Sequence, residues 1–335
     1  MGRGIKQIIK DCVPYGIMKK RIPGPDSLPH PVYVEGKTAL TPEIYANNGK
    51  IMKMFYLQDA LSAHTPYTLV EGRYPKEVLW DRFNYGLKEH FYGHHDIFIN
   101  KPHFQKKYGF LTESEVIVKS CFDRVMNSPE EIGEYDCIFT HSARVLDRYS
   151  NALFVPANGI WYGTVFNGGI FDKKAYLKKT KNISMISSNK AMCEYHKLRL
   201  DWARTFEHSD KVDTYGSFNG NYIEKKADTL TDYRYQIVVE NDVTPYYFTE
   251  KILDCFASMT VPIYVGATKI SEFFDADGII IVKPEEYDKI EEIISKCSSE
   301  DYEMRVEAIK RNYELCQKYM CVEDYLMENY REKFL

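Results

Sequence analysis

Apolar and polar positions along the chain follow two rhythms. Short apolar runs bounded by polar residues are typical of strands, and longer stretches with apolar residues every three or four positions are typical of helices. In the first half, the pattern predicts a helix over residues 76–91 and strands within residues 50–58, 95–100, 106–114 and 135–141. Such alternation indicates an α/β fold.

The second half repeats this rhythm. Helices are predicted over residues 194–206 and from residue 249, and strands within residues 182–189, 211–217, 234–241 and 261–266. Between the halves, residues 155–169 contain several Gly residues and a Pro, which is typical of a boundary between two units. Amphipathic helices are predicted from residue 284 to the end.

Length and composition agree with two soluble α/β units. A chain of 335 residues exceeds the size at which one hydrophobic core usually stops growing. Hydrophobic residues make up 44% of the chain and charged residues 27%, which is ordinary for a globular protein. Aromatic residues reach 14%, which suits surfaces that stack on sugars or bases, although most of them are expected to serve the core.

Charge argues against one class of partner. The net charge of −4 gives no support for nucleic-acid binding, which usually requires a basic domain. Residues 1–21 hold six basic residues and one acid, so this segment is expected either to be a solvated terminus, which we favour, or to make peripheral contact with anionic lipid. No apolar run reaches the ~18 residues of a membrane span. A cytoplasmic location is predicted, and the eight scattered cysteines without a CxxC pair are expected to be reduced.

Residues 238–251, VVENDVTPYYFTEK, carry the strongest chemical signal. They join a predicted strand to a predicted helix, and ligands of open α/β sheets bind at this end of the strands. Thr249 is a good helix N-cap, and Lys251 would add positive charge where a helix terminus already attracts phosphate. Glu250 could accept hydrogen bonds from a ribose. The alternative is a first-turn Glu that favours the helix dipole beside an exposed Lys.

Three segments resemble glycosyltransferase family 10, the α-1,3/4-fucosyltransferases. Residues 233–266 are similar to the family's pattern of an apolar run, Glu-Asn, a short loop, Tyr-x-Thr-Glu-Lys, a helix, and Val/Ile-Pro before a strand and Gly. Residues 183–216 resemble its Ser-Asn, Arg-bearing helix and Val-Asp-x-x-Gly segment, and FLTESEV at residues 110–116 resembles its Glu-bearing turn. Together the resemblance covers about residues 108–284. The loop at residues 242–245 departs from the family's usual Ser- or Gly-bearing version.

The resemblance implies a GT-B type fold, in which two Rossmann-like domains face a cleft, followed by C-terminal amphipathic helices. The implied boundaries are an extension at residues 1–45, an acceptor-binding domain at 46–165, a GDP-sugar-binding domain at 166–290, and helices at 291–335. Arg199 and Lys251 would contact the diphosphate and Glu250 the ribose. The other implied donor-site residues are Asn189, Glu240, Asn241 and Tyr247. Glu113 would be the general base, with Glu115 as the competing candidate.

The implied reaction is inverting transfer of L-fucose from GDP-β-L-fucose to a hydroxyl of GlcNAc or Glc in an oligosaccharide or glycolipid acceptor, with α-1,3 linkage expected. Transfer of another GDP-deoxyhexose is the alternative among enzymes. A nucleotide-sugar or glycan-binding protein without turnover is the alternative outside them, and the joint presence of Glu113, Arg199 and Lys251 disfavours it.

No cofactor is expected to be required, and a metal ion is expected at most to stimulate. Asp275 and Asp277 form a DxD pair, the metal motif of A-type glycosyltransferases, but they stand in a turn-like FFDADG sequence. His90, His94 and His95 have no metal-ligand spacing, because Gly93 interrupts the helix that they would need.

Overall fold

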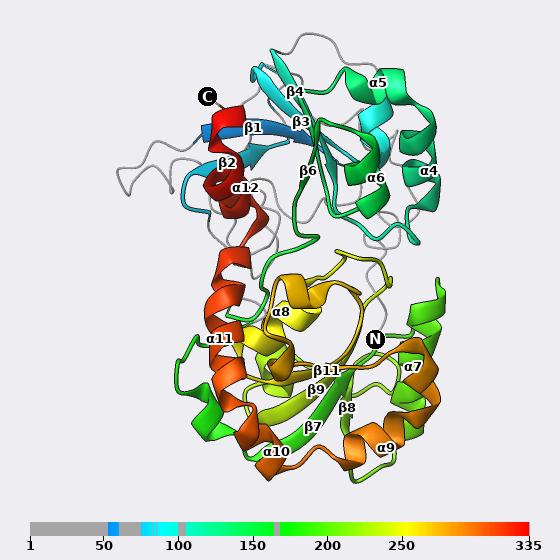
Figure 1. Ribbon diagram of the computed structural model, residues 1–335, viewed down its shortest axis with the longest axis vertical. Helices are drawn as coiled ribbons and strands as arrows, with labels where there is room; N and C mark the ends of the chain where they lie inside the picture. The colour runs from blue at the N-terminus through cyan, green and yellow to red at the C-terminus, as the bar shows by residue number, and fades with distance from the viewer. Residues whose placement is uncertain are drawn as a thin grey trace, which may run out of the picture.

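The computed structural model describes residues 53–59, 75–82, 84, 86–99, 105–163 and 168–334. The expected extension at residues 1–45, with its basic segment, lies outside this part of the chain. The described residues form two parallel sheets, one above the other, with helices around each (Figure 1). The predicted α/β class is confirmed.

The first sheet has the strand order β2-β1-β3-β4-β5-β6, and every neighbouring pair is parallel. Its strands are β1 (Lys53–Gln58), β2 (Val78–Asp81), β3 (Glu89–Gly93), β4 (Lys106–Leu111), β5 (Cys137–Thr140) and β6 (Ala152–Phe154). One face packs against α4 (Lys119–Asn127), α5 (Pro129–Gly133) and α6 (Ala143–Arg148). Because both faces are covered, most strand residues are buried.

Two expectations for this region are wrong. The helix expected over residues 76–91 is replaced by β2 and β3. All four residues of β2 are buried, and a continuous apolar run buried on both faces cannot be told from a helix by periodicity. The strand expected at residues 95–100 is the 3-10 helix η1 (His94–Phe98), because the chain turns at His94, whose φ is 47°.

The second sheet has the strand order β11-β10-β9-β7-β8 and is also parallel. Its strands are β7 (Lys181–Ile186), β8 (Asp213–Tyr215), β9 (Tyr233–Val239), β10 (Val261–Val265) and β11 (Ile280–Ile281). Helix α7 (Glu194–Phe206) packs on one face, and α8 (Glu250–Ala257) packs on the other. The strands and helices predicted here are confirmed.

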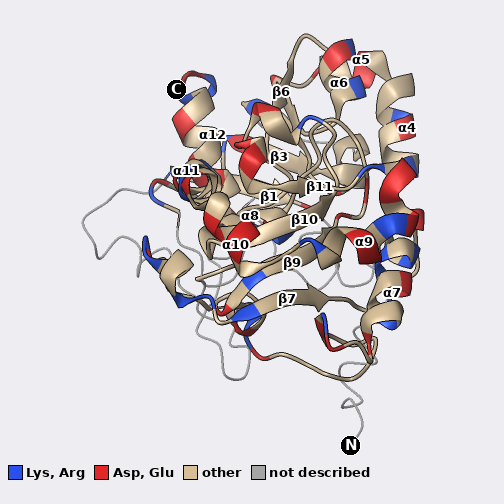
Figure 2. Cartoon of the chain, turned by 60° about the horizontal axis from the view of Figure 1, so that its bottom comes forward, with Lys and Arg blue, Asp and Glu red and all other residues tan. Residues whose placement is uncertain are grey.

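The C-terminal helices run back along both sheets (Figure 1). They are α9 (Ile290–Ser295), α10 (Ser299–Met304), α11 (Val306–Cys316) and α12 (Val322–Tyr330). The remaining 3-10 helices are η2 (Ala175–Lys178), η3 (Lys226–Thr229), η4 (Ile270–Glu272), η5 (Ala276–Gly278), η6 (Pro284–Lys289), η7 (Gln317–Tyr319) and η8 (Arg331–Lys333). Figure 2 shows acidic residues on the outer sides of α9 and α10, as expected for amphipathic helices.

Helix α12 packs on the face of the first sheet that lies opposite α4, α5 and α6. Trp80 in β2 donates its indole N–H to Glu323 Oε1 at 2.9 Å. The ring of Phe334 lies 5.2 Å from that of Phe55 and 5.8 Å from that of Phe139, measured between centroids. The end of the chain therefore completes the core of the first sheet. No helix within the described ranges is long and apolar enough to cross a membrane.

Candidate active site

A pocket of about 460 Å³ opens at the carboxyl end of the second sheet, beside β7 and β9. Its lining combines basic, acidic, amide and apolar side chains from six segments of the chain. The lining includes Trp161, Ile186, Ser188, Lys190, His196, Arg199, Ile223, Glu224, Lys226, Asn241, Glu250 and Lys251. Four of the residues implied by the family resemblance are among them, namely Arg199, Asn241, Glu250 and Lys251.

The N-terminus of α8 is fixed by a buried carboxylate. Thr249 is the N-cap, and its hydroxyl accepts the Lys251 backbone N–H at 3.3 Å. Glu240, which is fully buried at the end of β9, accepts the Thr249 N–H at 3.0 Å and its hydroxyl at 2.8 Å. Glu240 therefore holds the helix terminus from behind, and it does not belong to the lining of the pocket.

Lys251 is held between two carboxylates. Its Nζ lies 3.2 Å from Glu240 Oε2 and 3.4 Å from Glu250 Oε1. Burial alone would lower the pKa of Lys251, but these two carboxylates raise it above its ordinary value. Burial likewise favours neutral Glu250, yet Lys251 and Lys226 lower the pKa of Glu250 to about 2. Both groups are therefore charged at neutral pH.

Helix α7 brings a second cation to the pocket. Arg199 is 8% exposed and donates to the Val239 carbonyl at 3.1 Å and to Asn241 Oδ1 at 3.4 Å. The Asn241 amide oxygen also bonds His196 Nε2 at 3.0 Å. Burial lowers the pKa of Arg199, but an Arg stays protonated in proteins. Arg199 and Lys251 thus supply fixed positive charge in one pocket.

Trp161 and Lys226 line the pocket and Asn158 bonds one of its lining residues, and the sequence indicated none of the three. Asn158 donates to Glu250 Oε2 at 3.1 Å, and Trp161 donates its indole N–H to Asn158 Oδ1 at 3.3 Å. Lys226 Nζ lies 5.5 Å from the Trp161 ring centroid and 2.6 Å from Asp254 Oδ2. The boundary segment at residues 155–169 therefore contributes to the pocket as well as joining the two sheets. Its aromatic and Asn residues were the only available signal.

The turn after β4 carries Glu113. Tyr247, from the loop before α8, approaches Glu113 Oε1 with its hydroxyl at 3.5 Å. Glu113 Oε1 also accepts the Ser114 backbone N–H at 2.8 Å. Tyr247 is buried, and burial followed by the nearby carboxylates raises its pKa well above the ordinary value, so its hydroxyl remains a donor. The Glu113 carboxylate therefore faces the second sheet.

Glu115 has different surroundings. Its carboxylate accepts from the Ser142 hydroxyl at Oε1 and from Arg144 Nε at Oε2. Both partners lie at the start of α6, so Glu115 is engaged within the first sheet's own helices. Of the two acids, Glu113 is the one that contacts the loop before α8.

Asn189 is not part of the pocket lining, although its neighbours Ser188 and Lys190 are. It is exposed, and its side-chain amide donates to the Ser217 carbonyl at 2.7 Å.

The loop at residues 242–245, which departs from the family's pattern, contacts the turn after β4 of the first sheet. Asp242 Oδ2 accepts the Val116 N–H at 3.2 Å. This contact ties the Glu113 turn to the loop that precedes α8.

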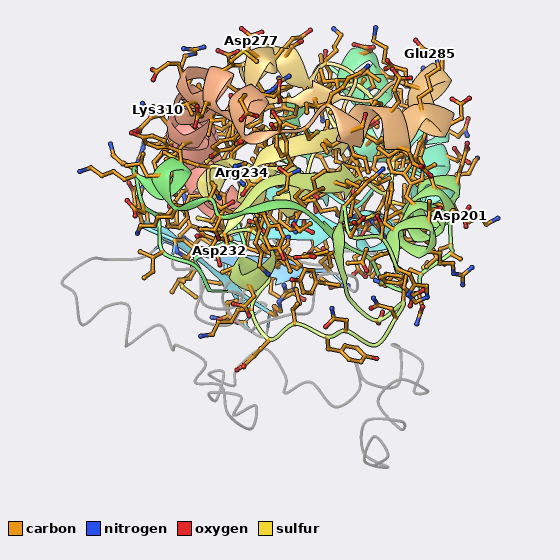
Figure 3. The ribbon with its side chains drawn as sticks, turned by 90° about the horizontal axis from the view of Figure 1, so that it is seen from below. Asp201, Asp232, Arg234, Asp277, Glu285 and Lys310 are labelled. Atoms are coloured by element: carbon orange, nitrogen blue, oxygen red, sulfur yellow. The ribbon has the colours of Figure 1, made fainter. Side chains whose placement is uncertain are left out.

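The weaker metal candidates have other roles. Asp275 caps η5 by accepting the Asp277 N–H at 3.0 Å, and it pairs with Arg311. Asp277 lies at the outer edge of the molecule (Figure 3). His90 bonds Tyr92 and the Leu87 carbonyl, while His94 bonds Asp59. Within the described ranges, no group of three or more His, Cys, Asp or Glu side chains could hold a metal ion.

Comparison with known proteins agrees with this geometry. Residues 176–313 match the model of glycosyltransferase family 10 (fucosyltransferase), C-terminal part. This segment contains every residue implied for the donor site, and the resemblance to that family is confirmed. The search of curated proteins finds no match.

Two solved structures are similar to this chain. An α1,3-fucosyltransferase with GDP-fucose is 14% identical, with a TM-score of 0.48, covering 82% of this chain and 95% of that chain. The Anabaena protein Alr3699/HepE in complex with UDP and glucose is 8% identical, with a TM-score of 0.52, covering 74% of this chain and 79% of that chain. The fold is of the GT-B type.

Proposed function

We propose that the chain transfers L-fucose from GDP-β-L-fucose to a hydroxyl of a glycan acceptor, because residues 176–313 match the model of the C-terminal part of glycosyltransferase family 10. The observation that carries this proposal is the joint position of Arg199, Lys251 and Glu250 in one pocket. Two fixed cations suit a diphosphate, and an ionised carboxylate beside them suits a ribose diol.

The cations would also assist departure of the leaving group. As the bond between the fucose anomeric carbon and the phosphate oxygen breaks, negative charge develops on GDP. Arg199 and the N-terminus of α8 with Lys251 are already oriented by Val239, Asn241 and Glu240. Charges that need no reorganisation stabilise such a transition state strongly. This is the role that we assign to them.

Glu113 would act as the general base. In an inverting transfer, the acceptor hydroxyl attacks the anomeric carbon on the face opposite GDP, and a carboxylate takes its proton in the same step. Glu113 fits this role because its carboxylate contacts Tyr247 in the loop before α8, whereas Glu115 is paired with Arg144. The acceptor is proposed to be GlcNAc or Glc in an oligosaccharide or glycolipid, with α-1,3 linkage.

Two other functions remain to be tested against this one. Transfer of another GDP-deoxyhexose would use the same pocket, since nothing in the cation pair selects fucose. A binding protein without turnover would need the pocket but no carboxylate opposite it, so the position of Glu113 favours the enzyme.

The direct test is a screen of GDP-sugars with short acceptors, read by mass spectrometry of the products. GDP-fucose with lactose or N-acetyllactosamine is expected to give a product 146 Da heavier than the acceptor, about the mass of one deoxyhexose residue, with release of GDP. If only a different GDP-deoxyhexose gave a product, the assignment of GDP-fucose as the donor would be wrong, but the protein would still be a glycosyltransferase. Tight GDP binding without any product would support the binding protein instead.

Chelation is expected to leave substantial transfer activity. Side-chain cations supply the positive charge at the proposed leaving group, so removal of divalent ions with EDTA leaves that charge in place. The measurement compares initial rates with EDTA and with added Mg²⁺ or Mn²⁺. A complete loss that added metal reverses would contradict this proposal and would reopen a metal role for Asp275 and Asp277.

A further inference from the structure

We propose that His94 and His141 are positioning residues that hold the backbone of Glu113 from both sides, and this inference rests on the proposed role of Glu113 as the base. Two buried imidazoles contact this one residue. His94 Nε2 lies 2.8 Å from the Glu113 amide nitrogen, and His141 Nε2 lies 3.0 Å from the Glu113 carbonyl oxygen. Neither histidine contacts the Glu113 carboxylate through these bonds. Each would instead hold the Glu113 backbone and so set the direction in which the carboxylate points.

The bonds of His94 fix its tautomer. Its Nε2 accepts the N–H groups of Glu113, at 2.8 Å, and Thr112, at 3.3 Å. An acceptor nitrogen carries no proton, so the proton of the neutral ring is on Nδ1. There it is donated to Asp59 Oδ1 at 3.2 Å. A chain of contacts thus runs from the end of β1 through His94 to the turn after β4.

The backbone conformation at Gly93 and His94 allows the contacts between Asp59, His94 and Glu113. His94 has a φ of 47°, a left-handed conformation that non-glycine residues seldom adopt. A Cβ at the preceding Gly93 would lie 2.3 Å from Asp59 Cγ, so only glycine permits the close approach of Asp59. His94 and Asp59 are 2% and 3% exposed. Such strain persists only where surrounding contacts hold it in place.

His141 has the opposite tautomer. Its Nε2 must donate, because its partner is the Glu113 carbonyl oxygen. The ring is fully buried, and burial lowers the pKa of His141 to about 4. Its ring centroid lies 4.8 Å from that of Tyr247, whose hydroxyl approaches Glu113 Oε1. His141 therefore links the Glu113 peptide to the same Tyr that meets its carboxylate.

The two histidines are expected to keep the Glu113 carboxylate pointing toward the reacting hydroxyl. Leu111 ends β4, so Glu113 stands in a turn that the sheet no longer constrains. A displacement of about 1 Å at a reacting group can cost roughly 10²-fold in rate. The two histidines limit such displacement through the backbone of Glu113, and neither of these bonds occupies a carboxylate oxygen.

A matched pair of variants tests the role of His94. In His94→Asn, the side-chain amide can still donate to Asp59 from the position of Nδ1, and Asn tolerates a positive φ, but nothing remains at the position of Nε2. In His94→Gln, an amide oxygen can replace Nε2. We expect His94→Asn to lower kcat about 10- to 100-fold with GDP affinity unchanged, and His94→Gln to recover most of the loss.

A double variant separates positioning from general damage. If His94 acts through Glu113, then His94→Asn combined with Glu113→Gln should be no slower than Glu113→Gln alone. Additive losses in the double variant, an unchanged kcat in His94→Asn, or a loss of GDP affinity together with kcat would each overturn the inference. Failure of the proposed function is distinct, because the unmodified chain would then transfer no fucose at all.

Discussion

Glu113→Gln is expected to reduce the turnover of fucose transfer by a factor on the order of 10² to 10⁴, which is the usual cost of losing a general base. The amide keeps the shape of the side chain but cannot take the acceptor proton. GDP affinity is expected to stay nearly unchanged, since Glu113 belongs to the first sheet and the cations belong to the second. Initial rates and isothermal titration with GDP measure the two quantities separately.

Glu115→Gln is the matched control, because it makes the same chemical change two residues away. Its carboxylate is paired with Arg144 and Ser142, so the expected loss of turnover is small. An inactive Glu115→Gln beside an active Glu113→Gln would reverse the assignment of the base. Full activity in both variants would place the base elsewhere in the protein.

Arg199→Ala and Lys251→Ala are each expected to weaken GDP binding by about 10- to 100-fold, because a hydrogen bond to a charged group contributes about 1.5 to 3 kcal/mol. Lys251→Ala also removes the shared partner of Glu240 and Glu250, and the two buried carboxylates would then repel an incoming phosphate. Of the two variants, Lys251→Ala should therefore lose more affinity. GDP should raise the melting temperature of the unmodified protein and do so less in both variants.

Lys296→Ala provides the control for charge alone. Lys296 is an exposed lysine that pairs with Glu292 on α9 and takes no part in the pocket. GDP affinity equal to that of the unmodified chain is expected for this variant. If Arg199→Ala and Lys251→Ala also bound GDP normally, the diphosphate would have to bind at another place, and the proposed donor site would be abandoned.

The sequence was most informative where local structure and chemistry coincide. Helix α7 begins and ends where the helical spacing predicts, and the strand, loop and helix around residues 238–251 are confirmed. Four implied pocket residues lie within these elements or directly beside them. In such a unit, the strand end and the helix start are neighbours in both sequence and space, so a short pattern is sufficient to locate the site.

The sequence was least informative where the site depends on distant segments. Asn158 donates a hydrogen bond to Glu250, which is 92 residues further along the sequence, and no local sequence pattern predicts this contact. Glu240 was expected in the pocket, but it is fully buried behind it, because its carboxylate is needed by the N-terminus of α8. The hydrophobic pattern also failed at β2, which is buried on both faces.

The return of the chain end to the first sheet has a consequence for the order of synthesis. Strand β6 ends at Phe154, but the aromatic layer of this sheet is not complete until Phe334 arrives. At about 5 to 20 residues per second, a ribosome needs on the order of 10 to 40 s to make the intervening segment. During that interval one apolar face of the nascent sheet lacks the cover that α12 and Phe334 give it in the described structure, so the half made first is the half finished last.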